Sequence, residues 1–212
     1  MEFTNRFYCD LLDYSYHRDI RLIKDLSGAN NVYIVENKET NTECIIYDFD
    51  DDLVFSFLGT EKNKIDISYN LFLFPIKIEN NIKLHNGYYF KYLSIERKLN
   101  LFIENFPNKN IKIHIIGHSM GGCLARLFYY YLMKNFKIFL ENKTYLFDIA
   151  TPSFSNLKLY NYVKGDFYLN SNDPIRFIPL WLIGYRKPKT LKILKTKKFL
   201  NFNYHLPSKY FI

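Results

Sequence analysis

The sequence predicts an α/β protein whose central sheet is mostly parallel, with helices on both faces and antiparallel strands near the N-terminus. Through the centre of the chain, short apolar runs of strand length alternate with longer segments of helical periodicity. Before them, three strand-like runs follow one another with only polar turns between. The chain has 212 residues, of which 48% are hydrophobic. We therefore expect one domain over residues 1–212 with a sizeable core.

The N-terminal part predicts two helices and three strands. Apolar side chains recur at helical spacing within residues 3–16, and residues 19–26 form a second short helical segment that ends before Gly28. The strand-like runs cover residues 31–36, 43–47 and 53–58. Because polar turn clusters separate these runs, we expect antiparallel hairpins.

Helices and strands alternate in the rest of the chain. A long helix is expected over residues 88–106, where apolar and aromatic side chains recur. A buried strand over residues 111–116 leads into a further amphipathic helix, which begins near Met120. The remaining expected elements are strands at 144–150 and 166–169, a short helix at 157–163, and a pair of strand-like runs at 181–185 and 191–194.

The turn after the strand at 111–116 has the sequence Gly-His-Ser-Met-Gly, residues 117–121. Strand, G-x-S-x-G and helix, in this order, form the setting of a nucleophile elbow. Glycines two residues before and after the serine leave room for a tight turn. The serine hydroxyl then stands at a helix N-terminus, which favours developing negative charge. The pattern predicts that Ser119 is a catalytic nucleophile.

A serine hydroxyl is a weak nucleophile until an imidazole takes its proton and a carboxylate orients that imidazole. In proteins with this elbow, the acid and then the histidine follow the serine along the chain. Of the five histidines, only His205 comes after Ser119, so His205 is the predicted base. His118 adjoins the nucleophile, but neighbours at a strand end point to opposite faces.

The acidic residues after Ser119 are Glu141, Asp148, Asp166 and Asp173. Glu141 precedes a predicted strand and Asp166 begins one, so both lie at the end of the sheet away from the nucleophile. Asp173 lies in a polar loop just after a strand, where catalytic loops gather in open α/β sheets. We predict that Asp173 is the orienting acid, with Asp148, inside the preceding strand, as the alternative.

An oxyanion hole needs backbone N–H donors beside the serine. Met120, the residue after the nucleophile, supplies one donor. Thr60, which follows Gly59 at the end of a strand, is the candidate for the second. Residues 61–74 come next and form a strongly apolar piece bounded by polar residues. We expect this piece to be either fixed core or a mobile cover.

Several segments resemble motifs of the class 3 lipases, a family with the α/β-hydrolase fold. Residues 57–60, Phe-Leu-Gly-Thr, look like the family's F-R-G-T/S segment, whose last residue donates to the oxyanion. Residues 85–88, His-Asn-Gly-Tyr, look like the H-x-G-F start of the long helix, and residues 150–152, Ala-Thr-Pro, stand where the family has G-S-P or G-A-P. Residues 172–175 and 177–179 resemble the N-x-x-D-x-V-P-x-x-P acid loop.

The resemblance covers most of the chain and implies a lipase or phospholipase that hydrolyses acyl esters through an acyl-enzyme. It also places the family's amphipathic lid at residues 61–74. Side chains there would cover the site or bind the acyl chain: Ile65, Ile67, Leu71, Phe72 and Leu73. Two departures stand out, because Leu58 replaces the usual arginine and the spacing from Asp173 to His205 is short for the family.

The net charge of +8 is concentrated in the C-terminal part of the chain. Up to Ser119 there are 14 Lys/Arg and 17 Asp/Glu, and after it 15 Lys/Arg and 4 Asp/Glu. Residues 186–198 hold seven basic residues in thirteen. We expect a solvated face or contact with an anionic membrane surface. Nucleic acid is the weaker alternative, since no nucleic-acid-binding motif accompanies the charge.

The sequence also carries expectations about location and cofactors. Its first residues lack the apolar stretch of a secretory signal, and no apolar run approaches the ~18 residues of a membrane span. Cys9, Cys44 and Cys123 are widely spaced and odd in number, which favours buried, reduced thiols. We therefore expect an intracellular protein, peripheral at membranes, with no metal ion or cofactor.

Two other functions are compatible with the same residues. A non-catalytic α/β-hydrolase-like module would bind lipid or a protein partner. A thioesterase or peptidase would use the same three side chains, because fold and triad do not fix the substrate. Candidates exist for every part of an ester-hydrolysing site, and this favours the enzyme over the binding module: Ser119, Asp173, His205, Thr60 and Met120.

Overall fold

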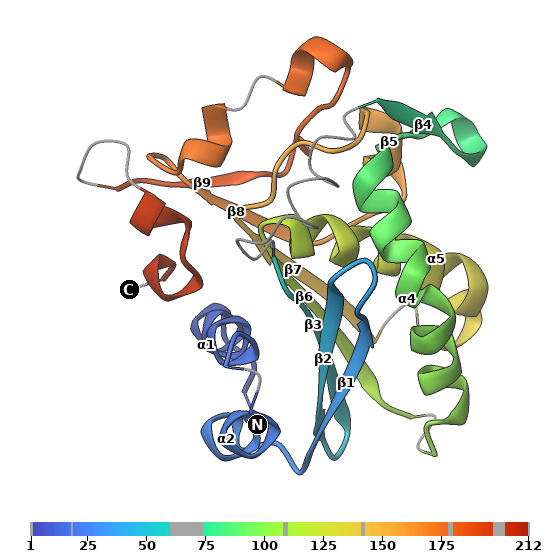
Figure 1. Ribbon diagram of the computed structural model, residues 1–212, viewed down its shortest axis with the longest axis vertical. Helices are drawn as coiled ribbons and strands as arrows, with labels where there is room; N and C mark the ends of the chain where they lie inside the picture. The colour runs from blue at the N-terminus through green and yellow to red at the C-terminus, as the bar shows by residue number, and fades with distance from the viewer. Residues whose placement is uncertain are drawn as a thin grey trace.

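The computed structural model describes residues 2–17, 19–59, 74–107, 110–140, 143–177, 180–196 and 202–211. In this part of the chain, seven strands form one sheet in the order β1-β2-β3-β6-β7-β8-β9 (Figure 1). They are β1 (Asn31–Asn37), β2 (Thr42–Phe49), β3 (Asp52–Phe57), β6 (Lys112–His118), β7 (Thr144–Ile149), β8 (Asp166–Asn170) and β9 (Lys192–Leu194).

The sheet is antiparallel at one edge and parallel through the rest. β1, β2 and β3 pair as consecutive antiparallel strands. Asn41 and Asp50, in the turns between them, have φ of 46° and 57°, a left-handed conformation that asparagine and aspartate tolerate. From β3 to β9, every neighbouring pair is parallel. The predicted α/β class and the predicted change of strand direction are confirmed.

Within the described ranges, four α-helices pack on the sheet: α1 (Asn5–Ser15), α2 (Ile20–Ser27), α4 (Asn86–Asn105) and α5 (Met120–Leu140). Side-chain caps and a glycine determine where α1 and α2 begin or end. The Thr4 hydroxyl accepts from the Phe7 N–H at 3.2 Å and begins α1, and the Asp19 carboxylate caps α2 in the same way. Gly28, with φ of 68°, ends α2 in the left-handed conformation that favours glycine.

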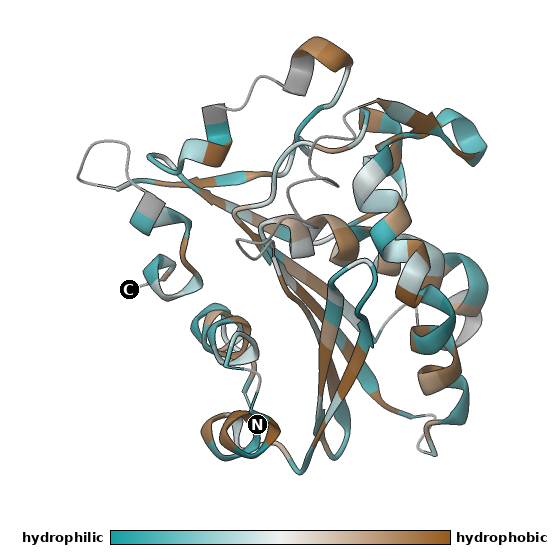
Figure 2. Ribbon diagram, viewed as in Figure 1, coloured by the Kyte–Doolittle hydropathy of each residue, from teal (hydrophilic) through white to brown (hydrophobic). Residues whose placement is uncertain are grey.

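The helices cover both faces of the sheet, as predicted. α1 and α2 lie on one side and α4 and α5 on the other, with hydrophobic residues concentrated along the strands between them (Figures 1 and 2). Successive side chains of a strand point to opposite faces. In β3, Phe55 and Phe57 accordingly pack with the α4 and α5 side chains, whereas Val54 packs with those of α1 and α2. The result is two hydrophobic cores, one on each face.

Two C-terminal predictions are wrong in detail. The expected helix at 157–163 is a 3₁₀ turn, η2 (Leu157–Asn161), and the expected strand at 181–185 begins as another, η4 (Leu180–Ile183). Gly184 follows with φ of 90° and turns the chain. β9 pairs with the edge of β8 through residues 168–170 instead of with 181–185. A small unpredicted hairpin, β4 (Pro75–Lys77) with β5 (Lys83–His85), precedes α4.

The remaining short elements connect these layers: η1 (Glu79–Asn81), η3 (Pro174–Phe177), η5 (Phe202–His205) and η6 (Pro207–Lys209). Cys9, Cys44 and Cys123 are free thiols and are buried, as expected. Within the described ranges, no helix has the length and hydrophobicity needed to cross a membrane.

Candidate active site

Ser119 stands between β6 and α5 in a tight, left-handed turn. Its φ of 57° is unusual for a residue with a side chain. A Cβ on Gly117 would lie 2.6 Å from the Gly121 carbonyl oxygen, so the turn leaves no room for a side chain there. The Ser119 N–H donates to the Ile149 carbonyl of β7 at 3.1 Å, which fixes the turn to the neighbouring strand. These contacts hold the serine at the C-terminal edge of the parallel strands.

The structure brings the three predicted catalytic side chains together. His205 Nε2 lies 2.9 Å from Ser119 Oγ, and His205 Nδ1 lies 2.9 Å from Asp173 Oδ2. Asp173 follows β8 and His205 lies in η5, so all three residues come from segments after strand ends or from the C-terminal tail. With Nδ1–H donating to the carboxylate, Nε2 can accept the serine proton. The arrangement can therefore activate a hydroxyl for attack on a carbonyl carbon.

The Asp173 carboxylate is fully buried and accepts several hydrogen bonds. Besides His205, the Ile175 N–H donates to Oδ1 at 2.9 Å, and the Tyr210 hydroxyl donates to Oδ2 at 3.3 Å. Burial, followed by the nearby Asp173, raises the pKa of Tyr210 well above its ordinary value, so Tyr210 remains a neutral donor. Such donors stabilise a charged carboxylate away from water.

Asn170 joins the acid loop to the histidine segment. Its side-chain Nδ2 donates to the Tyr204 carbonyl at 2.8 Å, one residue before His205. Its backbone N–H donates to the Tyr210 hydroxyl at 3.1 Å. Sequence reasoning missed both Asn170 and Tyr210. The only signal in the sequence was that Asn170 directly follows the predicted strand at 166–169, at the start of the predicted acid loop.

Asp148, the alternative acid, has a different partner. Its carboxylate pairs with the buried Arg126 guanidinium through two hydrogen bonds of 2.7 and 2.8 Å, and the Thr151 hydroxyl donates to it at 2.8 Å. Arg126 also lies over the Phe167 ring, 4.4 Å from its centroid. This bidentate pair occupies both Asp148 oxygens, and it binds α5 to β7.

Only part of the predicted oxyanion hole falls in the described ranges. Met120 is the first residue of α5, which places its N–H at the helix N-terminus. Thr60 lies outside the described residues, as do the candidate lid side chains Ile65, Ile67, Leu71, Phe72 and Leu73. Gly59 is described, and a Cβ on it would lie 3.0 Å from Ser119 Cβ. The loop that leads to Thr60 therefore abuts the nucleophile.

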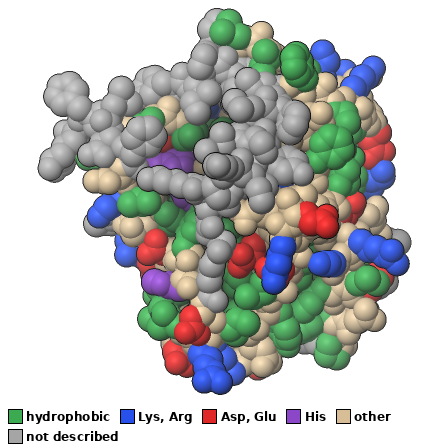
Figure 3. Space-filling view, viewed as in Figure 1, with side chains coloured by type: hydrophobic (Ala, Val, Ile, Leu, Met, Phe, Trp, Pro, Cys, Tyr) green, Lys and Arg blue, Asp and Glu red, His purple; other side chains and the backbone are tan. Residues whose placement is uncertain are grey.

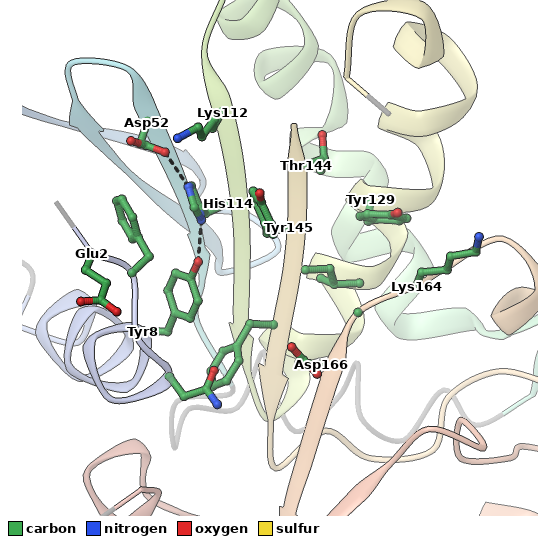
Figure 4. Close-up of a pocket in the computed structure, with 15 residues that line it drawn as sticks. Glu2, Tyr8, Asp52, Lys112, His114, Tyr129, Thr144, Tyr145, Lys164 and Asp166 are labelled. Carbon is green, nitrogen blue, oxygen red and sulfur yellow. Dashed lines mark hydrogen bonds and ion pairs between the residues drawn. The ribbon is translucent and has the colours of Figure 1, made fainter. Parts of the chain in front are cut away.

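The other histidines lie away from the serine hydroxyl or use their ring nitrogens elsewhere. His17 is exposed, and His85 accepts from the Tyr88 N–H at the start of α4. His114 lies at the opposite end of β6, where Nδ1 is 2.6 Å from the Tyr8 hydroxyl and Nε2 is 2.8 Å from Asp52 Oδ1 (Figure 4).

A pocket of about 590 Å³ adjoins His114 at that opposite edge of the sheet. Its walls include Tyr145, Asp166 and Lys164 as well as the side chains around His114 (Figure 4). Both nitrogens of His114 are already engaged, and none of the three predicted catalytic residues lines the pocket. No group of three or more metal-ligating side chains occurs in the described parts of the chain.

The fold and this site define a class of protein. The chain shares the α/β-hydrolase fold with solved lipase structures. One is a fungal lipase in complex with an inhibitor, described as a model for interfacial activation (TM-score 0.74, 19% identity, 85% of this chain and 75% of that chain covered). Another is the lipase of Rhizopus microsporus var. chinensis (TM-score 0.73, 16% identity, 92% and 74% covered).

A third is a triacylglycerol lipase whose catalytic centre is described as a serine protease triad (TM-score 0.65, 18% identity, 85% and 74% covered). Residues 54–182, more than half of the chain, match the family described as Lipase (class 3). The chain belongs to this family and is a serine hydrolase of the carboxylic ester class. No curated protein sequence matches it.

Proposed function

We propose that the protein hydrolyses lipid acyl esters through Ser119, His205 and Asp173, by way of an acyl-enzyme. The observation that carries this proposal is the continuous line of hydrogen bonds from the serine hydroxyl through the imidazole to a buried carboxylate. The family supports a lipid ester as substrate. Its lipase neighbours share the fold at low identity, so the residue roles rest on the geometry in this chain.

In the proposed reaction, Ser119 Oγ attacks the acyl carbonyl carbon while its proton moves to His205 Nε2. The carbonyl oxygen gains negative charge, which backbone N–H groups at Met120 and in the Thr60 loop stabilise. The ester C–O bond then breaks, and the departing alcohol takes the proton from His205. A water molecule repeats the sequence on the acyl-enzyme and releases the fatty acid. Asp173 stabilises the imidazolium in both halves.

We further propose that the substrate is presented at an anionic lipid surface. Leu206 follows His205 directly and is 46% exposed, and Leu182 of η4 is 68% exposed. Arg186, Lys189 and Lys195 are exposed in the segment that contains β9. Exposed apolar side chains together with basic ones are the composition of a surface that adsorbs to anionic membranes. Phospholipids or mixed acylglycerols in membranes are therefore the preferred substrate class.

The test is turnover of a short-chain nitrophenyl ester, followed by labelling with an organophosphonate and mass analysis of the intact protein. The parent should hydrolyse the ester and gain one label, and Ser119→Ala should do neither. Ser94→Ala, a serine on α4, serves as the matched control and should behave like the parent. Turnover or labelling that survives in Ser119→Ala would show that the reacting group is another residue. A parent that binds lipid without turnover would instead be a non-catalytic module.

A further inference from the structure

His118 is a buried side chain next to the nucleophile, and it takes no part in the hydrogen bonds between Ser119, His205 and Asp173. It is 5% exposed. Its Nε2 lies 2.6 Å from the backbone carbonyl oxygen of His205, and its Nδ1 lies 2.7 Å from the Tyr16 hydroxyl. The rings of His118 and His205 are 4.8 Å apart between centroids. The sequence excluded His118 as the base, and these contacts give it another place in the site.

The direction of each hydrogen bond follows from the chemistry of the groups. A carbonyl oxygen only accepts, so His118 Nε2 must carry the proton and donate to His205. In a neutral imidazole, Nδ1 then accepts, and the Tyr16 hydroxyl must donate to it. The same hydroxyl oxygen accepts from the Gly59 N–H at 2.8 Å. The result is one unbroken chain of hydrogen bonds, from Gly59 through Tyr16 and His118 to His205.

This chain joins the two sides of the candidate site. Gly59 precedes Thr60 and packs against Ser119 at one end. His205, whose ring faces the serine hydroxyl, lies at the other. A shift of the loop or of the histidine backbone would break at least one of the three hydrogen bonds. These hydrogen bonds therefore fix where Gly59, the residue before the candidate donor Thr60, and His205 lie relative to each other.

These hydrogen bonds can all form only while the His118 ring is neutral. Burial, followed by the neighbouring His205, lowers the pKa of His118 to about 3. At the pH of the proposed reaction, Nδ1 consequently remains an acceptor for Tyr16. A neutral ring also adds no positive charge beside His205, which becomes an imidazolium during the proposed reaction.

We propose that His118 and Tyr16 are positioning residues, which hold Gly59 and the His205 backbone in register across Ser119. This role rests on the proposed function, because it concerns the geometry of the same site. Tyr16 directly follows α1 (Asn5–Ser15), so the N-terminal helix is part of the catalytic scaffold through this contact. Neither residue touches the reacting atoms.

The protein offers a matched control at the other end of β6, the strand that ends with His118. There the Tyr8 hydroxyl lies 2.6 Å from His114 Nδ1, and His114 Nε2 lies 2.8 Å from Asp52 Oδ1 (Figure 4). Both networks bond a tyrosine of the N-terminal helical segment to a histidine of β6. Only the network of Tyr16 and His118 reaches Gly59 and His205. Tyr8→Phe and Tyr16→Phe thus remove equivalent hydroxyls, one far from the site and one beside it.

The experiment compares kcat and KM for a monomeric nitrophenyl ester with the unfolding midpoint of each variant. Tyr16→Phe and His118→Ala should each lower kcat about 10- to 100-fold, the size expected for a small displacement of catalytic groups. KM should change little. His118→Gln, whose amide can still donate toward the His205 carbonyl, should recover part of the loss. The double variant Tyr16→Phe/His118→Ala should be no slower than the worse single variant, because both act through one chain.

Tyr8→Phe should keep the parental kcat while lowering the unfolding midpoint about as much as Tyr16→Phe. An unchanged kcat in Tyr16→Phe and His118→Ala, in a preparation whose Ser119→Ala variant is dead, would overturn the positioning role and leave the proposed function intact. Equal kcat losses in Tyr8→Phe and Tyr16→Phe would also overturn it, because the effect would then be one of general stability. A parent without turnover would overturn the proposed function and this role together.

Discussion

At the residue scale, two buried aspartates near the C-terminal edge of the sheet pair with different kinds of side chain. Asp173 faces the histidine and Asp148 faces an arginine. Asp173→Asn should lower kcat by up to ~10⁴-fold and leave the fold intact, because the amide no longer stabilises the correct imidazole tautomer. Asp148→Asn should instead lower the free energy of unfolding by about 3 kcal/mol, because it leaves the Arg126 charge buried without its counter-charge. Ester kinetics and denaturant unfolding separate the two effects.

The control for this pair is Asp166→Asn, since Asp166 pairs with the exposed Lys192 at the other end of the sheet. A surface pair of this kind contributes little stability, so both readouts should stay near the parent. A large loss of kcat in Asp148→Asn, with Asp173→Asn active, would show that Asp148 in β7 is the orienting acid and that the assignment of Asp173 is wrong.

His118 carries a second residue-scale prediction, on pH. Its pKa is about 3 in the fold, against an ordinary 6.5, so below pH 6.5 the unfolded chain binds a proton that the folded chain refuses. Stability from this group is therefore complete above pH 6.5 and is lost as the pH falls toward 3. In His118→Gln, the slope of unfolding free energy against pH in this window should fall by up to ~1.4 kcal/mol per pH unit. Urea unfolding between pH 4 and pH 7, a range that covers most of this window and extends just above its upper end, measures the slope.

His114 also has its pKa lowered, first by burial, and it remains in this variant. Some pH dependence should therefore persist in His118→Gln. A slope identical to that of the parent would mean that His118 does not titrate in this range.

At the element scale, the strands and long helices were predictable because their signals are local. Alternating or continuous apolar runs mark β1, β2 and β3, and period-3.6 patterns mark α4 and α5. The 3₁₀ turns at η2 and η4 were misassigned, because a few apolar residues do not distinguish a strand, a turn and a short helix. The partner of β9 depends on the free edge of β8, which no local pattern describes.

The candidate site likewise combines residues that a local motif marks with residues that no local motif marks. Ser119 stood out through its elbow, and the chain order left His205 as the one histidine after it. The contacts of Tyr16 and Tyr210 span 102 and 37 residues of sequence, respectively. Neither residue has a motif of its own. A tyrosine in a chain with 19 of them gives no sign that its hydroxyl bonds a histidine beside the nucleophile.

At the same scale, we propose from the sequence that residues 61–74 form a mobile lid over the active site. Apolar side chains that cover the serine in water would turn outward at a lipid surface, where each Å² buried contributes ~25 cal/mol. Activity should therefore rise sharply when the substrate passes from monomers to aggregates. Leu71→Ser/Phe72→Ser should flatten that rise. Rate curves across the aggregation threshold measure the effect.

The control is Phe90→Ser, because Phe90 is a half-exposed phenylalanine on α4 (48% exposed). This variant should keep the rise in activity. A smooth saturation curve in the parent, with normal turnover of monomers, would favour residues 61–74 as fixed core.

At the scale of the whole molecule, β1 and β9 form the two edges of one sheet, which supports the proposal that residues 1–212 form a single domain. Positive charge is distributed unevenly over this domain. Among the coloured residues in Figure 3, acidic and basic side chains are intermingled. The excess of basic residues belongs to the sequence after Ser119, with its highest density at 186–198.

The last prediction is that this basic segment brings the enzyme to anionic bilayers. Each lysine near such a surface contributes about 1 kcal/mol, and the attraction fades over a Debye length of roughly 10 Å in 0.1 M salt. Replacing Lys192, Lys195, Lys197 and Lys198 by glutamine should therefore weaken binding to phosphatidylserine-containing vesicles and reduce its salt dependence. Hydrolysis of lipid in those vesicles should fall with binding, while turnover of a monomeric ester stays unchanged.

The matched control replaces four exposed lysines of the N-terminal part, Lys24, Lys38, Lys98 and Lys112, by glutamine. It removes the same total charge from a different surface. If position matters, this control should bind nearly as well as the parent at every anionic fraction, because its lost charges lie outside the basic segment. Equal losses in the two variants would mean that net charge alone governs adsorption. Binding that ignores both salt and anionic lipid would leave residues 186–198 as a solvated face.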